Sequence, residues 1–266
     1  MAFEIRDIDE SQAPLLDHLI ELRARLLRAI AAIAVSFAVC LYFASDIFGF
    51  LIRPLTQAFP AGQGKLVYTK LYEAFFVEIK IALFAAFFLS FPVIANQLWA
   101  FVAPGLYAKE KKAFLPFLFL TPLLFFAGAA MAYYLVMPEA FKYLLSFQGQ
   151  KGGLDIEALP AAGDYLGLVM QFILAFGISF LLPVLLLLLN RAGIVNRKKL
   201  IGLRRYVIVI LTGFAAVITP PDLMSQIMLL IPLLLLFEGS LLIMWLGERK
   251  EAKEAAAQQT LPEVIP

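Results

Sequence analysis

Glu21 is the first residue of the chain whose setting suggests binding chemistry, because one carboxylate stands among three arginines. Arg23, Arg25 and Arg28 follow it closely. At helical spacing the segment is amphipathic, with leucines on one face and charged groups on the other. Glu21 can pair locally with Arg25 one turn away, which contributes about 0.2–0.5 kcal/mol. It can also bind a cationic group of another molecule.

A second acid, Glu110, stands between Lys109 and the pair Lys111 and Lys112. Its simplest interpretation is a solvated loop acid that these lysines neutralise. Together with Glu21, it offers two carboxylates to a basic ligand.

Residue types that carry most enzyme chemistry are scarce. His18 is the only histidine and Cys40 the only cysteine. The sequence therefore predicts no nucleophile–histidine pair and no metal site built from these ligands. It also lacks a glycine-rich phosphate loop. We expect a protein that is not an enzyme, with no catalytic residues, no metal and no cofactor.

Charged residues are separated by long uncharged stretches. The 266 residues are 62% hydrophobic and 16% charged, which is unlike a soluble globular protein. Most of these stretches approach the ~20 residues that cross a bilayer as a helix. The sequence predicts an all-α polytopic membrane domain over residues 1–248 and a cytoplasmic, partly disordered tail over 249–266. Six transmembrane helices are expected, at about residues 26–45, 73–98, 113–138, 164–190, 206–219 and 223–246.

Charge distribution predicts the orientation of these helices. Six spans put both termini on one side, and most of the 22 lysines and arginines fall in segments that share that side. The positive-inside rule then places both termini in the cytoplasm. The basic clusters at 197–199 and 204–205 are interpreted as topological anchors.

The fifth and sixth spans are expected to be short. Residues 206–219 cover roughly 21 Å as a helix, well under the ~30 Å of the hydrocarbon core. Glu238 interrupts the sixth span and should face protein or water, with a hydroxyl or amide as partner. Such a hairpin either thins the bilayer locally or has its mismatch absorbed by neighbouring helices.

Prolines and glycines inside the spans indicate bending and close packing. We expect prolines to bend the helices into a concave bundle, although transporters with broken helices show the same pattern. Glycines are expected at packing contacts. The prolines are Pro92, Pro116, Pro122, Pro183 and Pro232, and the glycines are Gly128, Gly177, Gly213 and Gly239.

Several long motifs, in order along residues 15–247, make this chain resemble the TatC family of the twin-arginine protein translocase. These motifs are residues 18–23 (HLIELR), 73–76 (EAFF), 99–107 (WAFVAPGLY), 175–177 (AFG) and 219–222 (TPPD). The resemblance implies a receptor for signal peptides with paired arginines, on proteins that are exported already folded. It implies the bacterial inner membrane as the location. The implied partners are single-span TatA/TatB-type subunits, other copies of the chain and the lipid bilayer, with no nucleic acid.

The resemblance also implies which residues bind. Glu21 and Glu110 would hold the arginines of the signal peptide, because a guanidinium forks onto a carboxylate with two parallel hydrogen bonds. Two such contacts give about 3–6 kcal/mol, whereas micromolar binding needs about 8 kcal/mol. The apolar segment of the peptide should supply the difference, against concave helix faces. The residues expected to shape the site are Arg23, Phe101, Pro104 and Leu106.

Leu181 departs from the family pattern, which often has glutamate or glutamine at this position. That departure puts a polar contact with the single-span partners in doubt there. Thr219, Ser225 and Gln226 are the alternative contact, although such groups also bond within a helix bundle. Outer-loop residues to which the resemblance gives a structural or functional role are Pro54, Pro220, Pro221 and Asp222.

Two other functions stay open at this point. A secondary transporter of a small molecule or ion is consistent with prolines inside spans, but charged residues near the midplane are sparse. A membrane insertase or structural subunit would engage unfolded cargo.

Overall fold

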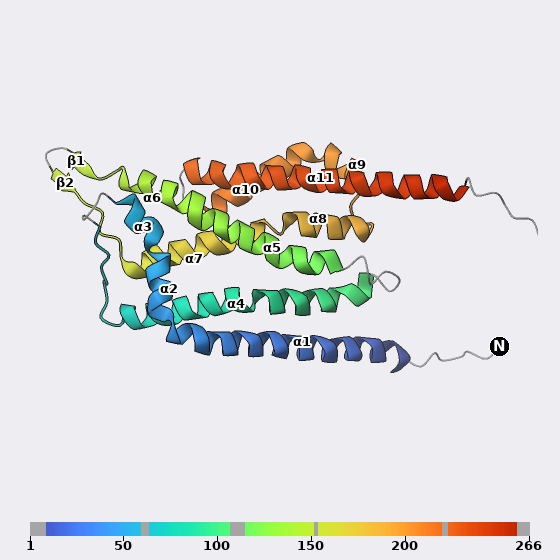
Figure 1. The fold of residues 1–266 in the computed structure, drawn as a ribbon, viewed down its shortest axis with the longest axis horizontal. Coiled ribbons are helices and arrows are strands. Elements are labelled where there is room, and N and C mark those ends of the chain that lie inside the picture. Colours follow the sequence, from blue (N-terminus) through green and yellow to red (C-terminus); the bar gives the residue numbers. More distant parts are fainter. Residues whose placement is uncertain (1–8, 60–63, 107–114, 152–153, 220–222, 260–266) are drawn as a thin grey trace, which may run out of the picture. The chain divides into compact units, whose positions relative to one another are not determined.

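The structure is a computed structural model that describes residues 9–59, 64–106, 115–151, 154–219 and 223–259. It is mostly helical (Figure 1). Within these described residues, five helical stretches are long and apolar enough to cross a membrane. They are Leu19–Tyr42, Glu73–Phe101, Phe117–Leu145, Ala162–Arg191 and Leu223–Arg249.

One short ribbon departs from the expected all-α fold. Strands β1 (Gly149–Lys151) and β2 (Leu154–Ile156) pair antiparallel between the third and fourth predicted spans. Gly149 has a φ of 120°, a conformation that glycine adopts without a steric cost. The chain is mostly helical as predicted, and this short hairpin, which satisfies its backbone groups locally, is an addition to that fold.

The chain divides into two compact units. The first comprises Met1–Arg53, Leu66–Pro122 and Ala161–Leu166, and the second comprises Pro54–Lys65, Leu123–Pro160 and Gly167–Pro266. Each unit is described by itself below.

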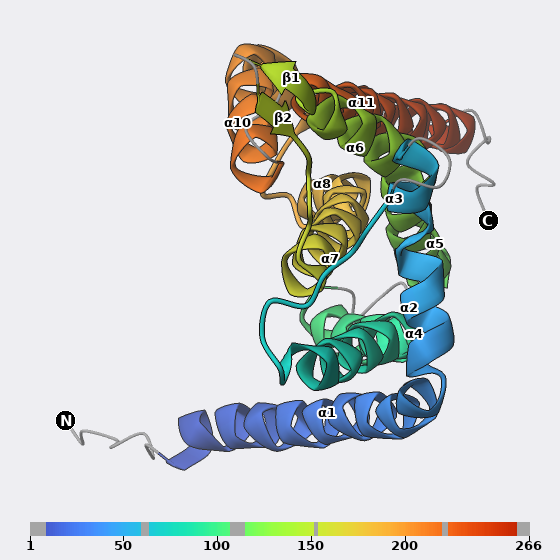
Figure 2. The same ribbon diagram turned by 90° about the vertical axis from the view of Figure 1, so that its left-hand side faces the viewer.

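The first unit is built on two long helices, α1 (Asp9–Tyr42) and α4 (Glu73–Leu106), which run antiparallel side by side (Figures 1 and 2). Helix α2 (Ala44–Leu51) also packs on α4. Small buried side chains at the contact let the helix backbones approach closely. Cys40, Ala82 and Ala86 form this cluster, with Phe37, Ile47 and Ala85 packed against it.

Glu73 begins α4 and organises the loop before it. Its Oε2 accepts hydrogen bonds from the backbone N–H of Thr69 at 2.6 Å and of Lys70 at 3.2 Å. Its Oε1 accepts the backbone N–H of Gly163 at 2.8 Å, at the start of α7 (Ala162–Ser179). One carboxylate therefore satisfies backbone donors in two segments that are far apart in the chain.

Aromatic side chains form much of the core of the second unit. Phe125, at the middle of α5 (Leu115–Met131), and Phe172 and Phe176, on α7, are fully buried. A Cβ built on Gly128 would lie 2.5 Å from the backbone oxygen of Phe176, so only glycine fits there. A Cβ built on Gly177 would likewise lie 2.8 Å from the Phe125 ring.

The packing role expected of the span glycines is thus confirmed for Gly128 and Gly177. It is wrong for Gly213 and Gly239, where a Cβ would have nothing within 4 Å.

Helix irregularities occur near two of the prolines. A π-helical turn, η2 (Ala132–Val136), precedes α6 (Met137–Leu145), whose first turn holds Pro138. The fourth predicted span is split into α7 and α8 (Leu182–Arg191), with Pro183 in the first turn of α8. Proline lacks an N–H and clashes with the preceding helical turn, so the backbone widens or restarts there. Pro122 and Pro232 lie inside α5 and α11, where no break occurs.

Of the two short helices predicted at the end of the chain, the first is short and the second is long. Helix α10 (Arg204–Ile218) has 15 residues and follows a short helix, α9 (Arg197–Gly202). Helix α11 (Leu223–Gln259) has 37 residues, and its membrane-compatible part has 27. The prediction of a short sixth span is wrong, because α11 continues through Glu238 and beyond residue 248. Helices α9 and α10 both pack on α11 (Figures 1 and 2).

Candidate functional site

The local ion pair at Glu21 is present in the structure. Oε1 of Glu21 accepts a hydrogen bond from Nε of Arg25 at 3.2 Å and a second from Nη2 of the same side chain. The Arg25 side chain is 17% exposed, whereas the Glu21 side chain is 38% exposed. The carboxylate is therefore the more accessible partner, and it already holds a guanidinium through two donors.

An apolar cavity of about 150 Å³ lies beside this pair, between α1 and α4. Arg25 is one of the lining residues, so the cavity is adjacent to the ion pair. Phe101 of α4, which was expected to shape the site, also lines it. The other lining residues are Leu22, Leu26, Ala29, Ile94, Gln97 and Leu98.

The structure thus brings Phe101 into one cavity with the partner of Glu21. Arg23 is exposed on α1 and is not among the lining residues. Glu110 lies outside the described residues, and so do the side chains of Pro104 and Leu106. Their expected roles stay predictions.

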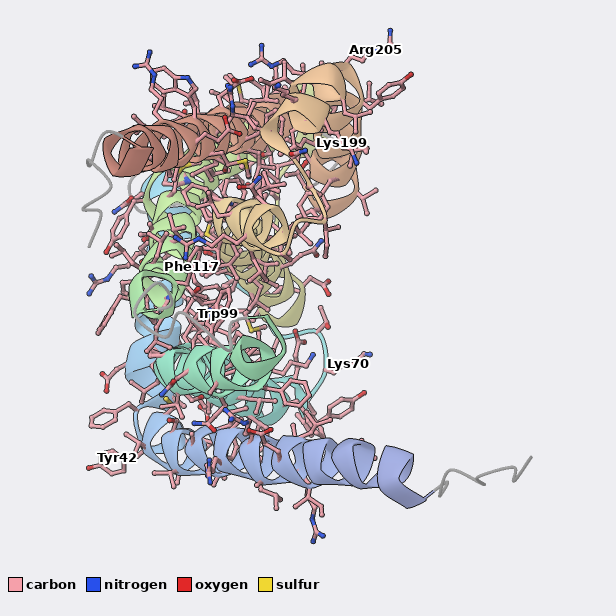
Figure 3. The ribbon with its side chains drawn as sticks, turned by 90° about the vertical axis from the view of Figure 1, so that its right-hand side faces the viewer. Tyr42, Lys70, Trp99, Phe117, Lys199 and Arg205 are labelled. Carbon is pink, nitrogen blue, oxygen red and sulfur yellow. The ribbon has the colours of Figure 1, made fainter. Side chains whose placement is uncertain are left out.

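The end of α4 is fastened to α5 by a buried polar contact. Nε1 of Trp99 donates a hydrogen bond of 2.7 Å to Oγ1 of Thr121, which itself donates to the backbone oxygen of Phe117 at 2.7 Å. The rings of Trp99 and Phe117 lie 5.7 Å apart, next to each other in Figure 3. This contact positions the helix segment that carries Phe101.

Thr219 and Gln226, near the start of α11, bond to backbone oxygens within the second unit. Oγ1 of Thr219 donates to the backbone oxygen of Ala215 at 2.9 Å, and Nε2 of Gln226 donates to that of Thr212 at 3.4 Å. Ser225 is fully buried. Internal bonding, which was the alternative interpretation of this cluster, is therefore present, and a contact with partner subunits stays a prediction.

Glu238 has a charged partner. Its Oε2 accepts a hydrogen bond from Nη2 of Arg204 at 2.7 Å, and both side chains are about half exposed. The expected hydroxyl or amide partner is wrong, because α10 begins at Arg204 beside this part of α11. A second pair, Arg197 with Glu248 at 2.8 Å, joins α9 to α11. Arg197 and Arg204 of the two basic clusters therefore hold α9 and α10 to α11.

The remaining predicted positions are partly described. Pro54 is buried in α3 (Arg53–Ala58), whereas Pro220, Pro221 and Asp222 lie outside the described residues. Leu181 occupies the break between α7 and α8, where its backbone N–H donates to Ile178. Within the described part of the chain, no three histidine, cysteine, aspartate or glutamate side chains gather as metal ligands.

Comparison with known proteins identifies the family. The family model of "Sec-independent protein translocase protein (TatC)" matches residues 17–232. The chain belongs to the TatC family. Among its relatives, TatC of Magnetococcus marinus is 49% identical over 94% of this chain and 90% of that protein. TatC of Escherichia coli is 40% identical over 86% of this chain and 87% of that protein.

A solved structure supports the same assignment. A crystal structure of the twin arginine translocase receptor TatC in DDM is 38% identical, with a TM-score of 0.73, and covers 85% of this chain and 98% of that one. The chain is therefore a TatC-type membrane component of a protein translocase. The region matched to TatC contains both the Glu21 pair and the residues near the α10–α11 turn.

Two features of this TatC chain were missed by sequence reasoning. Glu73 was noted only as part of a motif, and the capping-box spacing of three residues does not find it, because Thr69 lies four residues before it. Gln97 was not singled out at all. The two adjacent amides Asn96 and Gln97 on a long apolar helix were the sequence feature that could have drawn attention to it.

Proposed function

We propose that this chain is the receptor and core scaffold of a twin-arginine translocation system. It binds twin-arginine signal peptides at the cytoplasmic face and, with single-span TatA/TatB-type subunits and other copies of itself, exports folded proteins. The observation that carries this proposal is the Glu21 carboxylate, which holds a guanidinium through two donors at the edge of an apolar cavity.

Binding follows from the two parts of that arrangement. A signal-peptide arginine displaces Arg25 and forks onto the two oxygens of Glu21, while Glu110 takes the other arginine. Phe101 and its neighbours receive the apolar segment that follows. Lysine is a poor substitute because an ammonium cannot form the planar fork. The ionic contacts provide about 3–6 kcal/mol, and apolar burial raises this toward micromolar affinity.

The proposed topology has six spans in a bacterial inner membrane, with both termini in the cytoplasm. Its support is the concentration of basic residues in the termini and in the segments expected on that side. Helix α10 is the fifth span in this arrangement. Its 15 residues reach roughly 22 Å, so the bilayer is thin beside it or the helix is recessed.

Thr219, Ser225 and Gln226 are proposed as the contact for the single-span partners. Their support is their position at the two ends of the α10–α11 turn, next to the shortest span. Gln226 holds its backbone acceptor at 3.4 Å, a long hydrogen bond that a partner subunit can replace at little cost.

Charge reversal tests the receptor function. Glu21→Arg and Glu110→Arg should each abolish export of a folded reporter that carries a twin-arginine signal peptide, with the protein still present in the membrane. Glu139→Arg is the matched control, because it breaks an exposed local ion pair with Lys142 at 2.8 Å, outside the proposed site. Normal export by both site variants would overturn the proposal.

Crosslinking separates this function from the alternatives. A photoreactive residue at position 110 should crosslink to a twin-arginine peptide and not to its twin-lysine counterpart. A small-molecule transporter would instead take up substrate when the purified protein alone is placed in liposomes.

A further inference from the structure

Gln97 carries an unsatisfied polar atom beside the apolar cavity. Its side-chain oxygen is shielded from solvent and accepts no hydrogen bond from any residue that the structure describes. The residue lies on α4, one helical turn before Phe101, and lines the cavity. A buried acceptor without a donor is costly, and more so in a membrane, where water is scarce.

The neighbours of Gln97 in the cavity do not supply a donor. Leu22, Leu26 and Ala29 of α1 are apolar, and so are its neighbours on α4. Arg25 is the one cationic side chain of the lining, and its Nε and Nη2 are bonded to Glu21. The Gln97 side chain lines the cavity, so rotation of its amide brings this oxygen to a donor that arrives from outside the protein.

A signal peptide brings that donor in its backbone. Between its arginines at the water boundary and its apolar segment in the membrane, the peptide has side chains that donate nothing. Its backbone N–H groups still need acceptors, and the first four of any helix have none within the helix. Arg25 and Gln97 both line the cavity, so a peptide that enters it from Glu21 passes the Gln97 side chain.

We propose that the Gln97 side chain accepts a hydrogen bond from a backbone N–H of the bound signal peptide, at the junction between its arginines and its apolar segment. This rests on the proposed receptor function. Gln97 then fixes the register in which the apolar segment enters the cavity, and it does so for any sequence because it reads the backbone.

A double-mutant cycle tests the hydrogen bond. The probe is a synthetic peptide with two consecutive arginines and a leucine–alanine segment, N-methylated at one position at a time. Its affinity is measured for the purified wild-type protein and for Gln97→Met, which keeps the side-chain length and removes the acceptor. Asn96→Leu is the control, because that amide is exposed on the same helix and does not line the cavity.

Gln97→Met should weaken the unmodified peptide about threefold to tenfold, the range of one neutral hydrogen bond. Methylation at one position after the arginines should weaken wild-type binding by a similar factor and have no further effect on Gln97→Met. Equal methylation effects in both proteins, or unchanged binding by Gln97→Met, would show that the peptide backbone does not donate to this oxygen and would overturn the inference.

Two further measurements keep the outcome decisive. If Gln97→Met does not fold, the methylation scan on wild-type protein decides, because a uniform response at every position overturns the inference. Replacing both peptide arginines by lysine tests the receptor function separately. A protein that ignores this change fails as a twin-arginine receptor. A protein that prefers the arginine peptide, but whose response to methylation is the same with and without Gln97, overturns only the inference about Gln97.

Discussion

The carboxylate of Glu73 joins the start of α4 to the start of α7, because its Oε1 accepts the backbone N–H of Gly163 at 2.8 Å. The other oxygen accepts from the backbone and the side chain of Thr69, at 2.6 and 2.9 Å. The segment before α4 also bonds directly to α7, through the N–H of Ala162 and the oxygen of Val67 at 2.8 Å. These contacts make the end of the first unit one hydrogen-bonded structure.

Gly163→Ala should loosen this structure. The new methyl group would lie 2.8 Å from Oε1 of Glu73, so the carboxylate must move away from Gly163. We expect faster amide hydrogen exchange at Thr69 and Lys70, measured by mass spectrometry on the purified protein. Gly167→Ala is the control in the same helix, because nothing lies within 4 Å of its Cβ. Equal exchange in the two variants would contradict the role given to Glu73.

Gly128→Ala should destabilise the second unit by about 1–3 kcal/mol, the usual cost of overpacking a core. Its Cβ would lie 2.5 Å from the backbone oxygen of Phe176, which cannot retreat without shifting α7. The thermal unfolding midpoint in detergent should fall. Gly213→Ala has open space and should leave the midpoint unchanged or raise it slightly. The reverse order of the two midpoints would refute this packing.

The pair Arg204 and Glu238 should behave as an exchangeable ion pair. Glu238→Arg or Arg204→Glu places like charges together between α10 and α11, and each variant should reach the membrane at a reduced level. The native pair is 2.7 Å apart, and the double variant restores opposite charges at the same two positions. It should therefore recover most of the wild-type level in the membrane. Immunoblotting of membranes measures this. A double variant no better than the worse single one would show that each charge acts separately.

Arg25→Met should strengthen signal-peptide binding about twofold, because it removes the guanidinium that the peptide must displace and retains an apolar stem in the cavity. Titration with a fluorescent twin-arginine peptide measures the change. Arg25→Lys is the comparison, since it keeps the charge without the planar guanidinium. Its peptide affinity should lie between those of the wild-type protein and Arg25→Met. Weaker binding by Arg25→Met would mean that Arg25 contacts the peptide and does not compete with it.

Local features of this chain could be predicted well from sequence. The pairing of Glu21 with Arg25 needs only a helix and a spacing of four, and the brevity of α10 follows from the charged and proline residues around it. Apolar runs long enough to cross a bilayer gave the approximate positions of the spans because length and hydropathy alone decide them.

Features that depend on contacts between distant residues could not be predicted. Glu238 led to the prediction of a short sixth span because its partner could not be recognised from sequence. That partner, Arg204, lies 34 residues away on another helix. Once paired, the carboxylate no longer interrupts α11. The unsatisfied oxygen of Gln97 is likewise invisible in sequence, since it depends on which side chains of α1 face it.

Any cation that reaches Glu21 must replace one that is already bound. Recruitment of an arginine is then an exchange between two guanidinium groups, and the number of ion pairs is the same before and after. Added salt screens the departing pair and the arriving pair alike, so this step should depend little on ionic strength. A site of this kind selects its ligand by the shape of the cationic group and by the residues that follow the arginine. Additional positive charge on the ligand adds little to its affinity.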